Sequence, residues 1–105
     1  MSWTKILPVA ECPVGGARYI EASGHELAVF HLSDPDRIVV VRNSCPHAGG
    51  NLAAGEVSDD AVTCPWHQWK FNLDDGVCTL SPQVHLRRYE SKVEDGFVFV
   101  RLGND

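Results

Sequence analysis

Two short motifs carry the residues best suited to bind a metal. Cys45-Pro46-His47 supplies one thiol and one imidazole, and Cys64-Pro65-Trp66-His67 supplies a second pair. A proline follows each cysteine, and its fixed φ and missing N–H suit a ligand loop better than a central strand. The sixteen residues from Ala48 to Thr63 separate the motifs. Each motif is therefore a half-site, and the two can act together if the fold brings their loops face to face.

This ligand set fits two kinds of metal site. Two thiolates on one iron and two imidazoles on the other would hold a [2Fe-2S] cluster. The same four side chains also make a tetrahedral zinc set, which would be a structural zinc module. Zinc proteins more often group Cys with Cys and His with His, whereas each motif here mixes the two. The order of the ligands therefore favours the iron–sulfur cluster.

The rest of the sequence predicts an all-β domain. Short runs rich in Val, Ile, Phe and Tyr recur between turn residues, and helical periodicity is hard to find. One segment, 43–55, has little strand propensity and is expected to be an irregular functional loop. The carboxylate pairs Asp59-Asp60 and Asp74-Asp75 fall at predicted turns and are interpreted as solvated. The predicted strands are 3–7, 17–21, 26–32, 37–42, 61–64, 69–72, 85–93 and 97–102.

On these motifs, with their order and spacing, the sequence closely resembles the Rieske ferredoxins of bacterial ring-hydroxylating dioxygenase systems. Their signature is C-x-H followed at a distance by C-x-x-H. The resemblance implies the Rieske fold, with antiparallel sheets and a small cluster-binding subdomain, about 43–82, at one end of a single domain spanning 1–105. It implies one [2Fe-2S] cluster held by Cys45, His47, Cys64 and His67. Gly49 and Gly50 would let backbone N–H groups approach the sulfurs.

The resemblance also implies a role. Such ferredoxins carry single electrons from a flavin-dependent reductase to a terminal oxygenase and are not enzymes themselves. No flavin or nicotinamide fingerprint is present, and 105 residues leave no room for a second domain with a mononuclear iron site. An alternative within the same fold is the small Rieske subunit of an assimilatory nitrite reductase.

The sequence departs from the Rieske subunits of respiratory complexes, which the motifs also resemble. Those subunits place a disulfide-forming Cys in each ligand loop, where this chain has Gly50 and Trp66. They place Ser and Tyr hydroxyls against the cluster, where this chain has Trp69 and Phe71. Hydrogen bonds to the sulfurs stabilise the reduced cluster, so their absence predicts a potential toward the lower end of the Rieske range of about −150 to +300 mV.

Composition narrows the remaining possibilities. The net charge of −5 argues against nucleic-acid binding and favours a basic protein partner. No signal-peptide core or membrane-spanning run is found, so we expect a cytoplasmic monomer without a membrane partner. Cys12 and Cys78 are expected to be buried or partly buried free thiols. The histidines outside the motifs, His25, His31 and His85, are expected to be surface or core residues rather than ligands.

Overall fold

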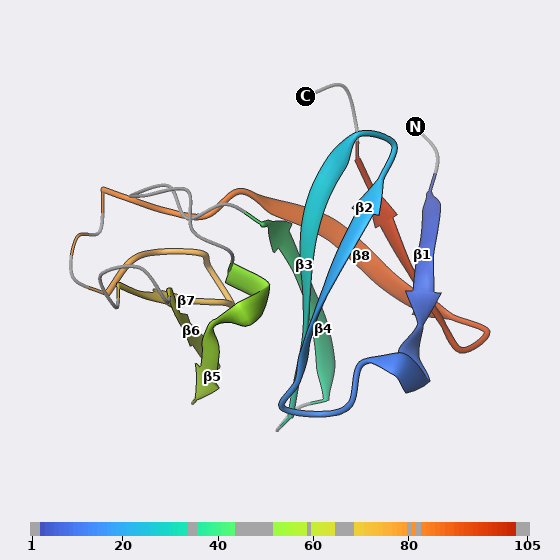
Figure 1. Ribbon diagram of the computed structural model, residues 1–105, viewed down its shortest axis with the longest axis horizontal. Coiled ribbons are helices and arrows are strands. Elements are labelled where there is room, and N and C mark those ends of the chain that lie inside the picture. The colour runs from blue at the N-terminus through green and yellow to red at the C-terminus, as the bar shows by residue number, and fades with distance from the viewer. Residues whose placement is uncertain are drawn as a thin grey trace.

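The computed structural model describes residues 3–33, 36–43, 52–58, 60–64, 69–79, 81 and 83–102. Within these residues the fold is all-β, as predicted, with two antiparallel sheets and two short 3₁₀ helices (Figure 1). The strands are β1 Thr4–Pro8, β2 Ala17–Ala22, β3 His25–Leu32, β4 Arg37–Arg42, β5 Glu56–Ser58, β6 Ala61–Thr63, β7 Lys70–Asn72, β8 Arg88–Glu94 and β9 Phe97–Arg101; the helices are η1 Val9–Glu11 and η2 Leu52–Ala54.

The larger sheet has six strands in the order β1-β9-β8-β4-β3-β2. Strand β8 changes partner along its length, because Arg88 and Tyr89 pair with β4 whereas Glu90–Glu94 pair with β9. This change of partner lets the β1-β9 end of the sheet fold over the β3-β4 part. A hydrophobic cluster fills the space between them, and its members include Leu7, Leu27, Val29, Val40, Val98 and Val100.

Strands β3 and β4 are buried on both faces, which explains the apolar run at Leu27–Phe30. Leu27 and Val29 point into the first cluster, whereas Ala28 and Phe30 point into a second one. The second cluster also contains Val62 and Phe71 from the small sheet, whose order is β5-β6-β7. Figure 1 shows this small sheet to one side of the larger one. The two sheets therefore share a core.

Two tight turns close the hairpins β2-β3 and β8-β9. The central residues of both turns have positive φ, 51° and 80° at Ser23-Gly24 and 54° and 81° at Asp95-Gly96. Two successive positive φ values are typical of the type I′ turn, whose twist matches that of the flanking strands. The Asp-Gly pair at the centre of the second turn is a typical sequence signal for such a hairpin turn.

Each of the eight predicted strands overlaps an observed strand, but some details were wrong. Strand β5 was missed, because no strand was predicted at Glu56–Ser58. Helix η2 was missed, because Leu52–Ala54 was included in the irregular loop. Strand β8 begins at Arg88 rather than at 85, and His85 forms only an isolated bridge with Val77. Neither described helix approaches the length needed to cross a membrane.

Candidate cluster-binding site

The structure describes one of the four predicted ligands, Cys64. It directly follows β6, is 0% exposed, and belongs to the hydrophobic cluster shared by the two sheets. Cys45, His47 and His67 lie outside the described residues, as do Gly49, Gly50 and Trp66. Among the described residues no group of three or more Cys, His, Asp or Glu side chains is close enough to hold a metal ion. The site must therefore be traced from the segments that flank the motifs.

The flanks of the first motif are joined by Asn43, a buried residue directly after β4. Its side-chain oxygen Oδ1 accepts a hydrogen bond from the backbone N–H of Ala53, at 2.8 Å. Its own backbone N–H donates to the carbonyl of Glu26, also at 2.8 Å, which extends the pairing of β3 and β4. The segment that bears Cys45 and His47 therefore leaves and re-enters the fold at neighbouring points.

The flanks of the second motif are joined by the backbone. Cys64 N–H donates to the carbonyl of Trp69 at 2.7 Å, next to the last β6-β7 pair, Thr63 and Lys70. Trp69 is half-buried and packs against the shared core. The second motif thus also starts and ends at one point in the structure.

Gly55 brings these two points together. Its N–H donates to the Leu52 carbonyl at 2.9 Å, and a Cβ built on it would lie only 2.3 Å from the Thr63 carbonyl oxygen. Leu52 follows the first motif and Thr63 precedes Cys64 of the second. The flanks of the two motifs are therefore in backbone contact, which is what a metal centre shared between two half-sites requires.

The donor chemistry around Cys64 fits an iron–sulfur centre. A buried thiolate in an apolar setting needs a metal or a cation to offset its charge. Phe71 is 0% exposed and pairs with Val62 in β6 and with Cys78. A cluster bound by the two motifs would supply one-electron redox chemistry. The apolar residues around Cys64 would limit its contact with water and would hold the thiolate in place.

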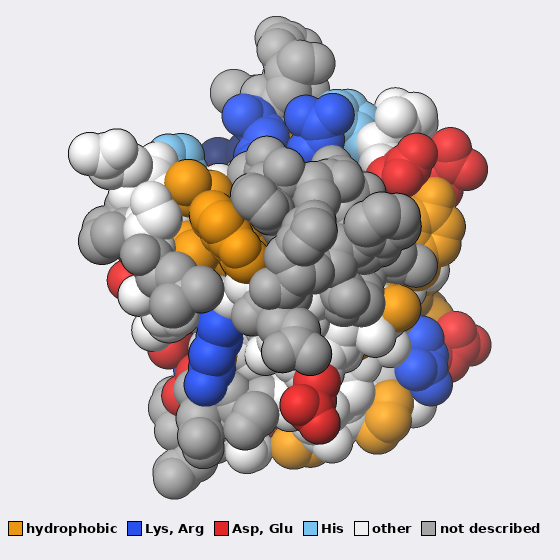
Figure 2. All heavy atoms as spheres, turned by 60° about the vertical axis from the view of Figure 1, so that its left-hand side comes forward, with side chains coloured by type: hydrophobic (Ala, Val, Ile, Leu, Met, Phe, Trp, Pro, Cys, Tyr) orange, Lys and Arg blue, Asp and Glu red, His pale blue; other side chains and the backbone are white. Residues whose placement is uncertain are grey.

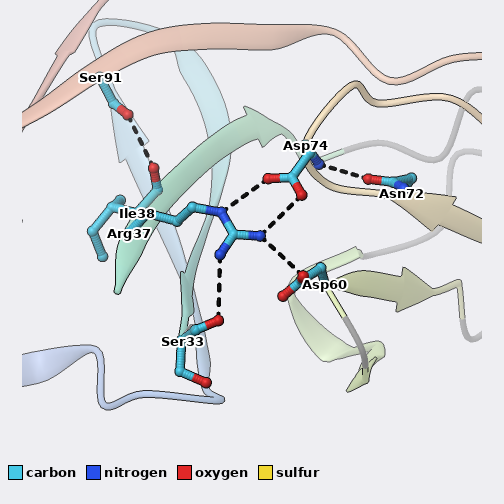
Figure 3. Close-up of polar contacts among 7 residues, drawn as sticks. All are labelled: Ser33, Arg37, Ile38, Asp60, Asn72, Asp74 and Ser91. Atoms are coloured by element: carbon cyan, nitrogen blue, oxygen red, sulfur yellow. Dashed lines mark hydrogen bonds and ion pairs between the residues drawn. The ribbon is translucent and has the colours of Figure 1, made fainter. Parts of the chain in front are cut away.

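The two turn carboxylates assigned as solvated form part of an ion-pair network (Figure 3). Arg37, at the start of β4, donates through Nε and Nη2 to Asp74 at 2.9 and 3.0 Å, and its Nη2 also lies 3.2 Å from Asp60. The hydrogen bonds that Arg37 donates to Asp74 raise the pKa of Arg37 above its ordinary value, with Asp60 adding to the effect. Both aspartates lie in turns of the small sheet, so Arg37 ties that sheet to the larger one. Sequence reasoning placed both aspartates at turns correctly but missed their partner.

The other cysteines and histidines behave largely as expected. Cys12 and Cys78 are buried free thiols, and burial raises the pKa of Cys12. His25 lies edge-on to the ring of Tyr89. His31 is buried, with Nδ1 at 2.6 Å from the Cys12 carbonyl and Nε2 against the Asp36 carboxylate. These contacts make His31 a hydrogen-bonded core residue.

Comparison with known proteins agrees with the motifs and the fold. The model of the Rieske [2Fe-2S] domain matches residues 2–90. The chain belongs to this family. Rieske domains hold a [2Fe-2S] cluster, so this Rieske chain carries one such cluster.

Among curated proteins, this Rieske domain is similar to the cholesterol 7-desaturase nvd of Drosophila melanogaster. The two are 36% identical over 106 residues, a match that covers 93% of this chain and 24% of the desaturase. The chain thus spans about a quarter of the length of that relative.

Two solved structures match over most of both chains. A chain in the complex of reduced oxygenase and oxidized ferredoxin in carbazole 1,9a-dioxygenase is 29% identical, with a TM-score of 0.82 and coverage of 93% of this chain and 91% of that one. A protein of Mycobacterium tuberculosis described as an NADH-dependent nitrite reductase small subunit is 27% identical, with a TM-score of 0.87 and coverage of 98% and 97%.

Proposed function

We propose that this Rieske chain is a one-electron carrier that takes electrons from a flavin-dependent reductase and delivers them to a terminal oxygenase. In this proposal Cys45 and Cys64 bind one iron of the cluster, and His47 and His67 bind the other. The observation that carries the proposal is the backbone contact at Gly55, because it joins the flanks of the two motifs. The 29% identity to a chain of an oxygenase–ferredoxin complex, over nearly its whole length, supports the choice of acceptor.

The ligand assignment is tested with two buried cysteines of the same hydrophobic cluster. Cys64 is 0% exposed and Cys78 is 1% exposed, so replacing either with Ser perturbs a similar environment. We expect wild type and Cys78→Ser to be red-brown, with two irons and two labile sulfides per chain. Cys64→Ser should fold but lose the cluster. A colourless wild type with one zinc, or equal iron contents in the two variants, would contradict the assignment.

The similarity to a nitrite reductase small subunit supports a second candidate function, a Rieske subunit that serves a sirohaem enzyme. The two candidates differ in the acceptor. Reduced holoprotein is mixed with a ring-hydroxylating oxygenase or with a sirohaem nitrite reductase, and cluster reoxidation is followed by stopped-flow absorbance. Fast reoxidation by the oxygenase alone supports the proposal, and fast reoxidation by the sirohaem enzyme alone supports the second candidate.

A further inference from the structure

Despite the net charge of −5, arginine is concentrated where the large sheet meets the small one. Arg42 ends β4, and Arg87 and Arg88 lie where the chain enters β8; all three side chains are exposed. Figure 2, which views the molecule from the side of the small sheet, shows Lys and Arg side chains gathered at the upper edge of this face, with His beside them. We refer to Arg42, Arg87 and Arg88 as the basic shoulder.

Two of these charges oppose each other across neighbouring strands. Arg42 N–H donates to the Arg87 carbonyl at 2.9 Å, and the adjacent register pairs Val41 with Arg88. The continued register sets Arg42 opposite Arg87, with their Cβ atoms about 5 Å apart on one face. Like charges in that position destabilise a sheet. Stability of the fold therefore does not explain the pair.

Two arginines of the shoulder carry a charge that no described residue neutralises through a salt bridge. The guanidinium of the third, Arg87, lies 5.4 Å from the ring centre of Tyr89. Arg42 and Arg88 form no salt bridge with any residue that the structure describes. Glu26, exposed near the start of β3, precedes Leu27, the residue that pairs with Arg42, and its single carboxylate can offset only one of the two charges of Arg42 and Arg88.

The short stretch of chain between them keeps the basic shoulder close to the first motif. Arg42 precedes Cys45 by three residues, so their Cα atoms are at most about 11 Å apart. This distance is comparable to the Debye length of about 10 Å at 0.1 M salt. A partner that approaches the first motif therefore comes within reach of the potential of the shoulder.

We propose that the basic shoulder docks an acidic surface patch of the protein that exchanges electrons with this chain. The inference rests on the proposed carrier function and names the chemistry of its partner. It reverses the expectation from net charge, which favoured a basic partner. Charged patches of this kind speed and orient encounters between redox proteins, and salt weakens the effect.

The first test measures docking without using the cluster. Hexaglutamate is titrated into the full-length holoprotein while backbone amide NMR shifts are recorded for wild type, for Arg42→Gln/Arg87→Gln, and for the control Lys5→Gln/Arg18→Gln. Both double variants change the net charge from −5 to −7, and the control sites are exposed residues of β1 and β2. We expect shifts around the shoulder in wild type and control, and at least tenfold weaker binding in the shoulder variant.

The second test measures electron transfer with a small anion. Each hexacyanoferrate(III) ion accepts one electron from the reduced protein and becomes hexacyanoferrate(II), while the cluster returns to its oxidised state. We expect the rate constant to fall as salt increases in wild type and control, and to be about tenfold lower in the shoulder variant at low salt. The reduction potential of each variant is measured as well, and rates are compared at equal driving force.

The outcomes separate the two proposals. A rate that rises with salt in wild type, or equal peptide binding by wild type and the shoulder variant, would overturn the docking surface even with a functional cluster. A wild type without a reducible cluster would overturn the carrier function, while the peptide titration would still decide the shoulder. Tighter binding of a hexanucleotide than of hexaglutamate at the same amides would replace the acidic protein partner with a nucleic acid and would also overturn the proposal.

Discussion

The backbone contact at Gly55 predicts a specific effect of adding one methyl group. In Gly55→Ala the new Cβ would lie 2.3 Å from the Thr63 carbonyl oxygen, 3.0 Å from Val62 Cγ2 and 3.2 Å from the Leu52 carbonyl oxygen. Real Cβ atoms essentially never approach closer than 3.0 Å, so the Thr63 carbonyl or Gly55 must move by about 0.7 Å. Two of the three obstacles are backbone atoms, which cannot rotate away.

The expected destabilisation follows from two opposing terms. Overpacking of this kind costs about 1–3 kcal/mol. Alanine also reduces the entropy of the unfolded chain, which offsets about 0.4–1 kcal/mol. We therefore expect a net loss of about 1–2 kcal/mol, and a melting temperature lower by about 5–15 °C for a domain of this size. Because Thr63 precedes Cys64, the movement should also alter the EPR spectrum of the reduced cluster.

The matched control is Gly24→Ala in the β2-β3 turn. Gly24 has a φ of +80° and nothing within 4 Å of its added Cβ, so this substitution strains the backbone without touching either motif. It should lower the stability by about 1 kcal/mol and leave the EPR spectrum unchanged. Thermal unfolding and EPR are measured on both holoproteins. A Gly55→Ala protein with wild-type stability and spectrum would refute the argument that the motif flanks are in rigid contact.

Three further predictions concern other described residues. Both ring nitrogens of His31 face acceptors; burial lowers its pKa, but the hydrogen bonds to the Cys12 carbonyl and to Asp36 outweigh burial and raise the pKa above 6.5. The stabilisation by His31 is therefore full below pH 6.5 and lost as the pH rises through the folded pKa, so the effect of His31→Gln in urea unfolding should shrink from pH 6 to pH 9. Arg37→Gln should destabilise the protein more at low salt than in 1 M NaCl, where the Debye length is about 3 Å; equal effects would contradict the ion-pair network. We expect voltammetry to give a wild-type reduction potential nearer −150 than +300 mV. The potential should be higher in Phe71→Tyr if the new hydroxyl reaches a sulfur. A wild-type potential above about +200 mV would refute the argument from missing hydrogen-bond donors.

Local chemistry was enough to predict much of the fold. Strand β3 has a continuous apolar run, and Asp95-Gly96 has the residues that a type I′ turn needs, so both could be recognised without tertiary information. Helix η2 and strand β5 could not, because each has only three residues, which is too few to show a periodic pattern. Helix η2 is held by the hydrogen bond from the Ala53 N–H to the Asn43 side chain, and β5 is held by its pairing with β6, as between Val57 and Val62.

The candidate site also has a part that could be predicted from the sequence and a part that could not. Four ligands, Cys45, His47, Cys64 and His67, were predicted from residue type and spacing, and the assignment of all four remains a prediction. The structure added what holds the motifs: the Asn43 side chain, the approach at Gly55 and the Arg37 network. No local signal marks Arg37 as a partner of Asp60 and Asp74, because these aspartates follow it by 23 and 37 positions in the sequence. Such contacts depend on how the two sheets meet.

The way in which the motifs are attached shows how a small domain fixes the points at which they join the fold. The first motif follows β4, which is paired with β3 and buried on both faces, so its starting point lies in the part of the fold least able to move. The second motif is closed by β6-β7 pairing and by the Cys64–Trp69 hydrogen bond. Gly55 then fixes one attachment against the other. Electron exchange gains from such rigidity because ligands that are already held in place need little rearrangement when the charge of the centre changes.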